Sequence, residues 1–185
     1  MKKLILLFAV LCISVSTWGY DFAVDGIYYA ITSSTAPYKV EVSHDTGSNS
    51  YSGTVTIPSS VTYNSISYSV TSIGSYAFAI STGLNTVNIP TSVDSIKTWA
   101  FYGCTGLTSI AIPTSVTSIG DGTFGGCTSI TNISIPVSVK KIGYYVFFGC
   151  TELTLINTDA ANTNFSSANG VLYNKDLKFR TNKKT

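Results

Sequence analysis

Few side chains in this 185-residue sequence could take part in catalysis, and they form no recognisable catalytic pattern. The single histidine, His44, ends a predicted strand in the stretch YKVEVSHDTGSN, so a nucleophilic triad would have only this one base. Four acids of the same N-terminal region could pair for acid–base chemistry: Asp21, Asp25, Glu41 and Asp45. Their spacing brings no two of them together. We therefore interpret them as solvated surface charges and predict neither a catalytic residue nor an enzymatic activity.

Cysteine is the remaining residue type that could bind a metal or form a cross-link. Three cysteines follow one another at intervals of 23 residues, which is not a metal-ligand spacing: Cys104, Cys127 and Cys150. The sequence also lacks an HExxH motif and a glycine-rich phosphate loop, so we predict no metal and no cofactor. We expect three free thiols, buried as small apolar side chains. A disulfide between neighbours is the alternative, because strands stacked about 5 Å apart satisfy the distance that a disulfide requires.

Aromatic side chains provide the candidate binding surface. Five of them stand two residues before or one residue after a regularly spaced phenylalanine: Tyr76, Trp99, Tyr102, Tyr145 and Phe148. Tyrosine and tryptophan are the usual anchors of binding surfaces, so we predict that these side chains face outward and contact a partner. The alternative is that they pack against each other, with Gly122 and Gly125 interrupting the row. A second candidate face carries small, uncharged side chains: Thr86, Asn88, Ser109, Ala111, Asn132 and Ser134.

One 23-residue unit positions these residues, and it occurs four times between Ser69 and Ala160. The third copy reads SVTSIGDGTFGGCTSITNISIPV. A valine, an isoleucine, a phenylalanine and two further aliphatic positions return in every copy. One unit alone buries too few apolar side chains to offset the ordering of its backbone. The copies are therefore expected to stack on one another as a solenoid.

Each unit is expected to contain two extended segments and one tight turn. LTSIAI alternates apolar and polar residues and ends at Pro113, which has no N–H for a strand ladder. SVTSIG is a second extended segment that ends at Gly120. The stretch DGTFGGC is too short and too rich in glycine for a regular helix, so we predict a tight turn that inserts Phe124 into the core.

The stretch from Leu107 to Cys127 follows the pattern L-x-x-I-x-I-P-x-S-V-x-x-I-G-x-x-A-F-x-G-C, with Thr123 in place of alanine. This repeated pattern resembles the BspA-like leucine-rich repeats, the LRR_5-type surface antigens. The resemblance implies a β-rich α/β fold, a curved right-handed solenoid of 23-residue repeats with a parallel sheet along one face. It also implies a secreted or surface-exposed protein, and some family members act as adhesins. Lys97 and Ser81 depart from the pattern, where the family has glycine and cysteine.

The segments on either side of the repeats have roles of their own. Residues 1–19 have a basic start and an apolar stretch, which predict a secretory signal peptide; a retained anchor and a lipoprotein modified at Cys12 are the alternatives. Residues 20–68 alternate apolar and polar side chains and hold a nine-residue insertion, which predict an N-terminal β cap with an inserted hairpin. Residues 161–185 are expected to be an incomplete repeat and a basic tail, either truncated or paired back as a makeshift cap.

Charge argues against one class of partner. Residues 20–174 hold four basic and eight acidic residues, whereas a nucleic-acid groove needs clustered lysine and arginine. We therefore predict a secreted or cell-surface leucine-rich-repeat protein that binds an extracellular protein or a glycan without catalysis, and that has no membrane span after signal removal. The alternatives are a truncated structural or vestigial repeat protein without its own ligand, and a hydrolase that uses paired carboxylates.

Overall fold

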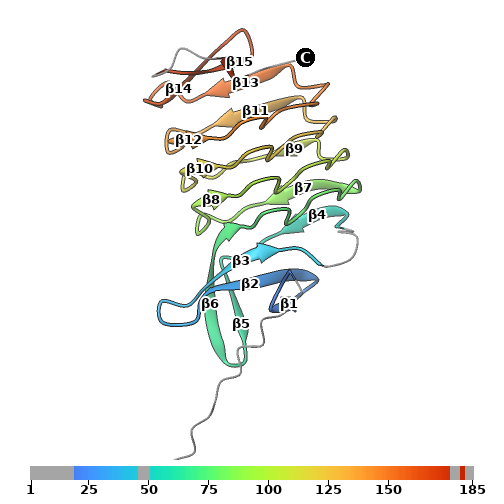
Figure 1. Cartoon of the computed structure of the whole chain (residues 1–185), viewed down its shortest axis with the longest axis vertical. Helices are drawn as coiled ribbons and strands as arrows, with labels where there is room; N and C mark the ends of the chain where they lie inside the picture. The colour runs from blue at the N-terminus through green and yellow to red at the C-terminus, as the bar shows by residue number, and fades with distance from the viewer. Residues whose placement is uncertain (1–18, 46–50, 176–179, 182–185) are drawn as a thin grey trace, which may run out of the picture.

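The computed structural model describes residues 19–45, 51–175 and 180–181, and its strands stack along one long axis (Figure 1). The predicted signal peptide therefore lies outside the described residues except for Gly19. None of the described residues lies in an α-helix, so the helical part of the expected α/β class is wrong. The turn around Phe124 cannot be helical, because Gly122 (φ 58°) and Gly126 (φ 73°) have left-handed backbone on either side of it. Among the described residues there is accordingly no helix that could span a membrane.

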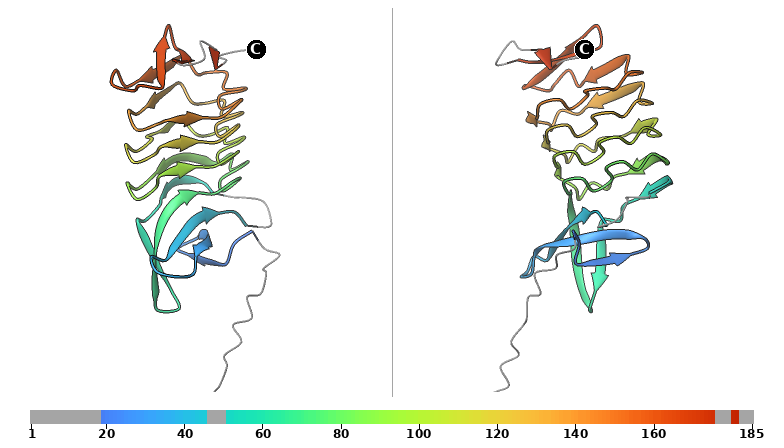
Figure 2. Two further views of the ribbon diagram at one scale, coloured as in Figure 1. Left: turned by 60° about the vertical axis from the view of Figure 1, so that its left-hand side comes forward. Right: turned by 45° about the vertical axis from the view of Figure 1, so that its right-hand side comes forward.

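The N-terminal strands form an antiparallel group that continues into the repeats. They are β1 (Phe22–Val24), β2 (Ile27–Ser33), β3 (Lys39–Ser43), β5 (Ser60–Tyr63) and β6 (Ile66–Ile73). β2 pairs antiparallel with β1 and with β3. β5 and β6 also pair antiparallel, and they form a hairpin that projects from the end of the stack (Figure 2). β3 runs parallel to β6, with Val40 opposite Val70 and Val42 opposite Ile73. The N-terminal block and the repeats therefore share one sheet.

A parallel ladder continues from β6 through one short strand of each later repeat. Its strands are β8 (Ser95–Ile96), β10 (Ser118–Ile119) and β12 (Lys141–Ile142). Isoleucines 23 residues apart are register partners along this ladder: Ile73, Ile96, Ile119 and Ile142. Because hydrogen-bonded strands lie about 4.8 Å apart, the isoleucine side chains form a continuous row.

A second set of parallel strands lies on the opposite side of the stack (Figure 1). It comprises β4 (Gly53–Thr56), β7 (Leu84–Asn88), β9 (Ser109–Ile110), β11 (Asn132–Ile135) and β13 (Leu155–Thr158). β4, β7 and β9 form one sheet, and β11 and β13 form another. Val87 faces Ile110 in the first of these sheets and Ile133 faces Ile156 in the second, again residues 23 apart.

The turns that lead from the first ladder to the second are hydrogen-bonded to each other as well. Three amides of the second repeat donate to carbonyls of the third: Trp99 to Asp121 (2.8 Å), Phe101 to Thr123 (2.9 Å) and Gly103 to Gly125 (2.8 Å). The same arrangement joins the first repeat to the second and the third to the fourth. The turn backbone thus finds its hydrogen-bond partners in neighbouring repeats, as buried amides require.

A row of phenylalanines runs through the core beneath the turns. The rings of Phe78, Phe101, Phe124 and Phe147 stack almost parallel, with successive centroids 5.1, 5.6 and 5.9 Å apart. The valines at the other corner, Val93, Val116 and Val139, are fully buried. Side chains at equivalent positions therefore contact each other from repeat to repeat.

The three cysteines form a further row, and they are free and buried, as expected. Each thiol donates to a phenylalanine carbonyl of the preceding repeat at 3.0 Å: Cys104 to Phe78, Cys127 to Phe101 and Cys150 to Phe124. Burial raises the pKa of the Cys150 thiol to about 11. The hydrogen bond with Cys104 and burial raise the pKa of Cys127 as well. Cys127 and Cys150 are therefore held protonated inside the fold.

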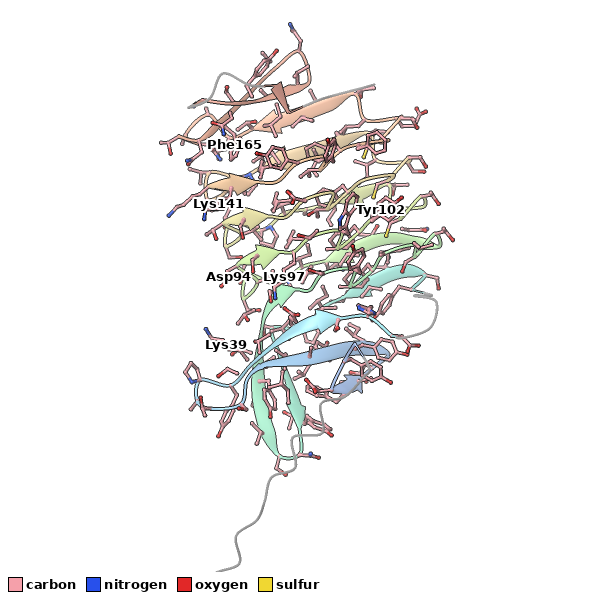
Figure 3. The ribbon with its side chains drawn as sticks, viewed as in Figure 1. Lys39, Asp94, Lys97, Tyr102, Lys141 and Phe165 are labelled. Carbon is pink, nitrogen blue, oxygen red and sulfur yellow. The ribbon has the colours of Figure 1, made fainter. Side chains whose placement is uncertain are left out.

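Lys97, which departs from the repeat pattern, links the N-terminal block to the second repeat (Figure 3). Its Nζ forms an ion pair with Glu41 of β3, across the first repeat. The same carboxylate accepts a hydrogen bond from the hydroxyl of Ser72 at 3.3 Å. A glycine at this position could not make that link.

The chain downstream of β13 forms a small antiparallel sheet, which consists of β14 (Phe165–Ala168), β15 (Val171–Asn174) and β16 (Arg180–Thr181). Phe165 and Leu172 are buried in the common core. Asn162 is fully buried: its amide donates to the carbonyls of Pro136 (2.8 Å) and Val139 (3.1 Å). Most of the predicted basic tail lies outside the described residues.

Replacing a ring of the phenylalanine row is expected to destabilise the whole stack. Phe101→Ala removes a fully buried side chain that contacts a ring on either side, which should lower the free energy of unfolding by about 3–5 kcal/mol. The matched control is Tyr144→Ala, because Tyr144 is 79% exposed and should cost no more than about 0.5 kcal/mol. Urea unfolding followed by circular dichroism measures both, and equal losses would contradict a shared core.

The cysteines are expected to be unreactive in the folded protein. In a Cys12→Ser background, Cys104, Cys127 and Cys150 should react with the thiol reagent DTNB at pH 8 only after urea is added. The folded thiols are buried, and the raised pKa of Cys150 leaves little reactive thiolate at that pH. Fast labelling of the native protein, or fewer than three thiols in urea, would contradict this arrangement.

Candidate functional site

The turns between the two ladders expose seven large side chains, which we call the aromatic turn surface. Its members are Tyr76, Ile80, Trp99, Tyr102, Tyr144, Tyr145 and Phe148. Of the five residues predicted from the sequence, four are exposed and Trp99 is half-buried. Tyr144, Tyr145 and Phe148 of the fourth repeat are 79%, 72% and 57% exposed, so this repeat presents the largest apolar area. Contiguous exposed apolar side chains of this size are uncommon unless they bind something.

Ile80 and Tyr144 belong to this surface although the sequence analysis did not select them. Ile80 occupies the position at which the other repeats have Gly103, Gly126 and Gly149, and its φ of 61° is left-handed like theirs. Tyr144 occupies a position that is Ser75, Thr98 or Asp121 elsewhere. Both residues could have been found from the sequence, because each is a large apolar side chain at a position where the other repeats have glycine or a polar residue.

Three of the aromatic residues have a backbone conformation that suits glycine. Tyr76, Trp99 and Tyr145 have φ values of 59°, 56° and 57°, and the equivalent Gly122 has 58°. A bulky residue in the left-handed region costs about 1–3 kcal/mol, and it persists only where the surrounding structure holds it. The carbonyl of Trp99 accepts from the Tyr102 amide at 3.1 Å, which closes the turn. Glycine would build the same turn with less strain, so the aromatic side chains are not needed for the turn itself.

The glycines of the third repeat do not leave a gap in the surface, because Trp99 covers them. A Cβ atom placed on Gly122 would overlap the indole ring, and one on Gly125 would lie 3.3 Å from both Trp99 and Tyr102. Gly122 and Gly125 are accordingly buried although they lie in an exposed turn. The space that two missing side chains leave in one repeat is therefore occupied by the aromatic side chains of the repeat before it.

The aromatic side chains form two edge-to-face pairs. Trp99 and Tyr102 have ring centroids 5.0 Å apart at 86°, and Tyr145 and Phe148 have centroids 6.4 Å apart at 86°. Such T-shaped contacts are a preferred geometry of aromatic rings. The pairs belong to the second and fourth repeats, so they are separated by two strand spacings, about 10 Å. These aromatic residues thus pack against each other within the second and the fourth repeat, while Tyr102, Tyr145 and Phe148 stay exposed.

Two acids and one lysine lie in the turns. Asp121 is exposed beside Gly122, and its Oδ1 accepts the backbone N–H of Tyr144 at 2.7 Å. The equivalent turn segments 74–83, 97–106, 120–129 and 143–152 contain one further acid, Glu152, and one lysine, Lys97, which is ion-paired with Glu41. No group of His, Cys, Asp or Glu side chains within the described residues could hold a metal ion.

Acidic side chains of the N-terminal block form hydrogen bonds with different partners. The carboxylate of Asp21 accepts the amide N–H of Ile31 at 2.6 Å, and that of Asp45 accepts the Tyr28 hydroxyl at 3.5 Å. Only Asp25 lines the nearby hollow of about 260 Å³ between the β1–β2 turn and β4. Asp25 is thus the one acid of the described residues that lines this hollow, and Asp21 and Asp45 are held by hydrogen bonds of their own.

The face of β9, β11 and β13 carries a shallow hollow of about 520 Å³. Its lining combines isoleucine and proline with amide and hydroxyl groups, and it includes Ala111, Asn132 and Ser134 of the second candidate face. The remaining residues of that face, Thr86, Asn88 and Ser109, lie outside the hollow. This surface has neither the exposed aromatic side chains nor the left-handed backbone of the turn side.

Stacked parallel strands with buried columns of leucine, isoleucine and phenylalanine define a strand-rich leucine-rich-repeat fold. The family model of the BspA type leucine rich repeat region matches this chain in six copies over residues 47–175, which extends on both sides of the four copies seen in the sequence. The chain belongs to the BspA-type leucine-rich repeat family. None of the curated proteins matches it.

Solved structures of bacterial leucine-rich repeat proteins resemble this chain. One from Bacteroides ovatus is 30% identical with a TM-score of 0.53, over 74% of this chain and 41% of that protein. One from Bacteroides capillosus is 24% identical with a TM-score of 0.61, over 75% and 98% of the two chains. The pneumococcal vaccine antigen PcpA is 21% identical with a TM-score of 0.53, over 85% and 54%. The chain thus spans 41% and 54% of the lengths of the first and third of these proteins.

Gly122→Ala is expected to displace Trp99 from the turn. The new methyl group would overlap the indole ring, and φ of 58° adds a backbone cost of about 1–2 kcal/mol. In a Trp18→Phe background Trp99 is the sole tryptophan, so its emission maximum should shift to longer wavelength as water reaches the ring.

Gly126→Ala is the matched control for this experiment. Its φ of 73° imposes a similar backbone cost, but its Cβ would lie 3.5 Å or more from any neighbouring atom. The control should lose stability without a shift in emission. The same emission in both variants would contradict the packing of Trp99 on Gly122.

Proposed function

We propose that this chain is a secreted or surface-displayed binding protein without catalytic activity, which contacts an extracellular partner through the aromatic turn surface. The observation that carries the proposal is the presence of large aromatic side chains at left-handed positions where glycine would strain the backbone less. Rigid, exposed tyrosine and tryptophan side chains are typical of the residues that dominate binding energy. Export is supported by the basic and apolar N-terminal stretch and by the family to which the chain belongs.

The proposal includes the architecture expected from the sequence. In it, the repeats form a curved right-handed solenoid of 23-residue units, and the strands of residues 20–68 cap the first repeat. The register partners 23 residues apart and the pairing of β3 with β6 support this view. Such an array presents one rigid surface, so a partner would be bound with little loss of conformational freedom in this chain.

The aromatic turn surface can be tested against the hollow of the β9–β11–β13 face. The Trp99→Ala/Tyr102→Ala variant should lose binding to immobilised extracellular glycoproteins or glycans by more than about 30-fold, since central aromatic anchors contribute about 2 kcal/mol or more. Asn132→Ala/Asn157→Ala alters two exposed residues of the hollow and should bind like the parent chain. Surface plasmon resonance measures both variants, and the reverse ranking would assign binding to the hollow.

A further inference from the structure

We infer that the partner of the aromatic turn surface is a basic protein segment, held by guanidinium groups that stack on the exposed rings beside Asp121. This inference rests on the proposed function and names the chemistry of its ligand. Three observations carry it: the charge of the turn segments, the geometry of the two aromatic pairs, and the position of Asp121 between them.

The turn surface attracts cations because its one lysine is ion-paired and its other charged residues are acidic. Asp121 and Glu152 are exposed, whereas Lys97, at the start of the second turn, is paired with Glu41. Of the other lysines of the repeats, Lys141 lies in β12 and Lys140 directly precedes it. Figure 3 shows Lys39 and Lys141 along the side opposite to Tyr102. A polyanion would be repelled from this surface, whereas a basic segment would be drawn to it.

The exposed rings provide the faces on which a cation binds. A guanidinium group within about 6 Å of a ring centroid is attracted by the negative face of the ring, most strongly with tryptophan. Arginine suits such a site better than lysine, because its planar group stacks on aromatic rings and is more weakly hydrated. Tyr145 and Phe148 are more than half exposed, and Trp99 and Tyr102 offer a second pair two repeats away.

Asp121 supplies the counter-charge between the two pairs. It lies beside Gly122, the glycine that the Trp99 ring covers, and its Oδ1 is fixed by the amide of Tyr144. The carboxylate is exposed, so it can also accept N–H donors of a guanidinium group. Two arginines three positions apart in a polyproline II segment point to the same side and lie about 9 Å apart, close to the separation of the aromatic pairs.

The test uses the full chain with Trp18→Phe, so that Trp99 reports binding by its fluorescence. The probe is a peptide of Arg-Gly-Ser repeats, and its matched control carries citrulline, the uncharged analogue of arginine. The arginine peptide should change the emission of Trp99 saturably and bind at least tenfold more tightly than the citrulline peptide. Binding should weaken as salt is raised.

Asp121→Asn distinguishes the carboxylate from the rest of the turn, because asparagine keeps an oxygen for the Tyr144 amide. This substitution should weaken the binding of the arginine peptide several-fold. Asp94→Asn is the control, since Asp94 is an exposed acid on the other side of the stack and should have no effect (Figure 3). Equal effects of the two variants, or equal binding of the two peptides, would overturn the inference.

The failure of this inference and the failure of the proposed function give different results. If a neutral glycan or an acidic protein binds, is insensitive to Asp121→Asn and is lost in Trp99→Ala/Tyr102→Ala, the cationic ligand is wrong and the aromatic turn surface stands. The Trp99→Ala/Tyr102→Ala variant lacks the reporter ring, so its binding is measured by surface plasmon resonance. If the arginine peptide binds to it as to the parent chain, both the surface and the ligand are wrong.

Discussion

The hydrogen bonds between equivalent positions of successive repeats are the constraint on which the rest of the structure depends. Strands of two residues, such as β8 and β10, cannot be stable by themselves. The amides that follow them, those of Lys97 and Gly120, donate to Ile73 and Ile96 of the preceding repeat. In the turns, Phe101 donates to Thr123 of the following repeat. Each repeat is thus completed by its neighbours, and side chains at one position are brought into rows.

These rows of equivalent side chains explain why the repeats have the same core residues but different surface residues. In the core, the stacked phenylalanines and the buried thiols require the same residue type in almost every repeat, because each contacts its own counterpart. At the surface, the left-handed turn position holds Tyr76, Trp99, Gly122 and Tyr145 on nearly the same φ. The backbone is therefore constant where the side chain varies. The choice of side chain at this position is therefore not dictated by the fold.

Much of this arrangement could be predicted from the sequence, because rows of equivalent residues are visible in the repeat itself. The buried valines, isoleucines and phenylalanines, the free thiols of Cys104 and Cys127, and the exposure of Tyr145 all follow from their place in the unit. The features that were missed depend on contacts between different positions. Trp99 covers the glycines of the next repeat, and Lys97 reaches Glu41 across the first repeat. The helical component of the expected fold class was wrong, because left-handed residues on either side of the turn stop a helix.

The left-handed turn position has a consequence for how such surfaces diversify. A site that accepts glycine, tyrosine or tryptophan on one backbone can exchange one for another without a change in the turn, but at Gly122 the Trp99 ring of the preceding repeat would have to move. The outer side chains of two adjacent repeats would therefore change together where one packs on the other, as Trp99 does on Gly122. A repeat protein of this kind could acquire a new ligand through substitutions of a few outward residues, while the buried residues that determine the fold stay the same.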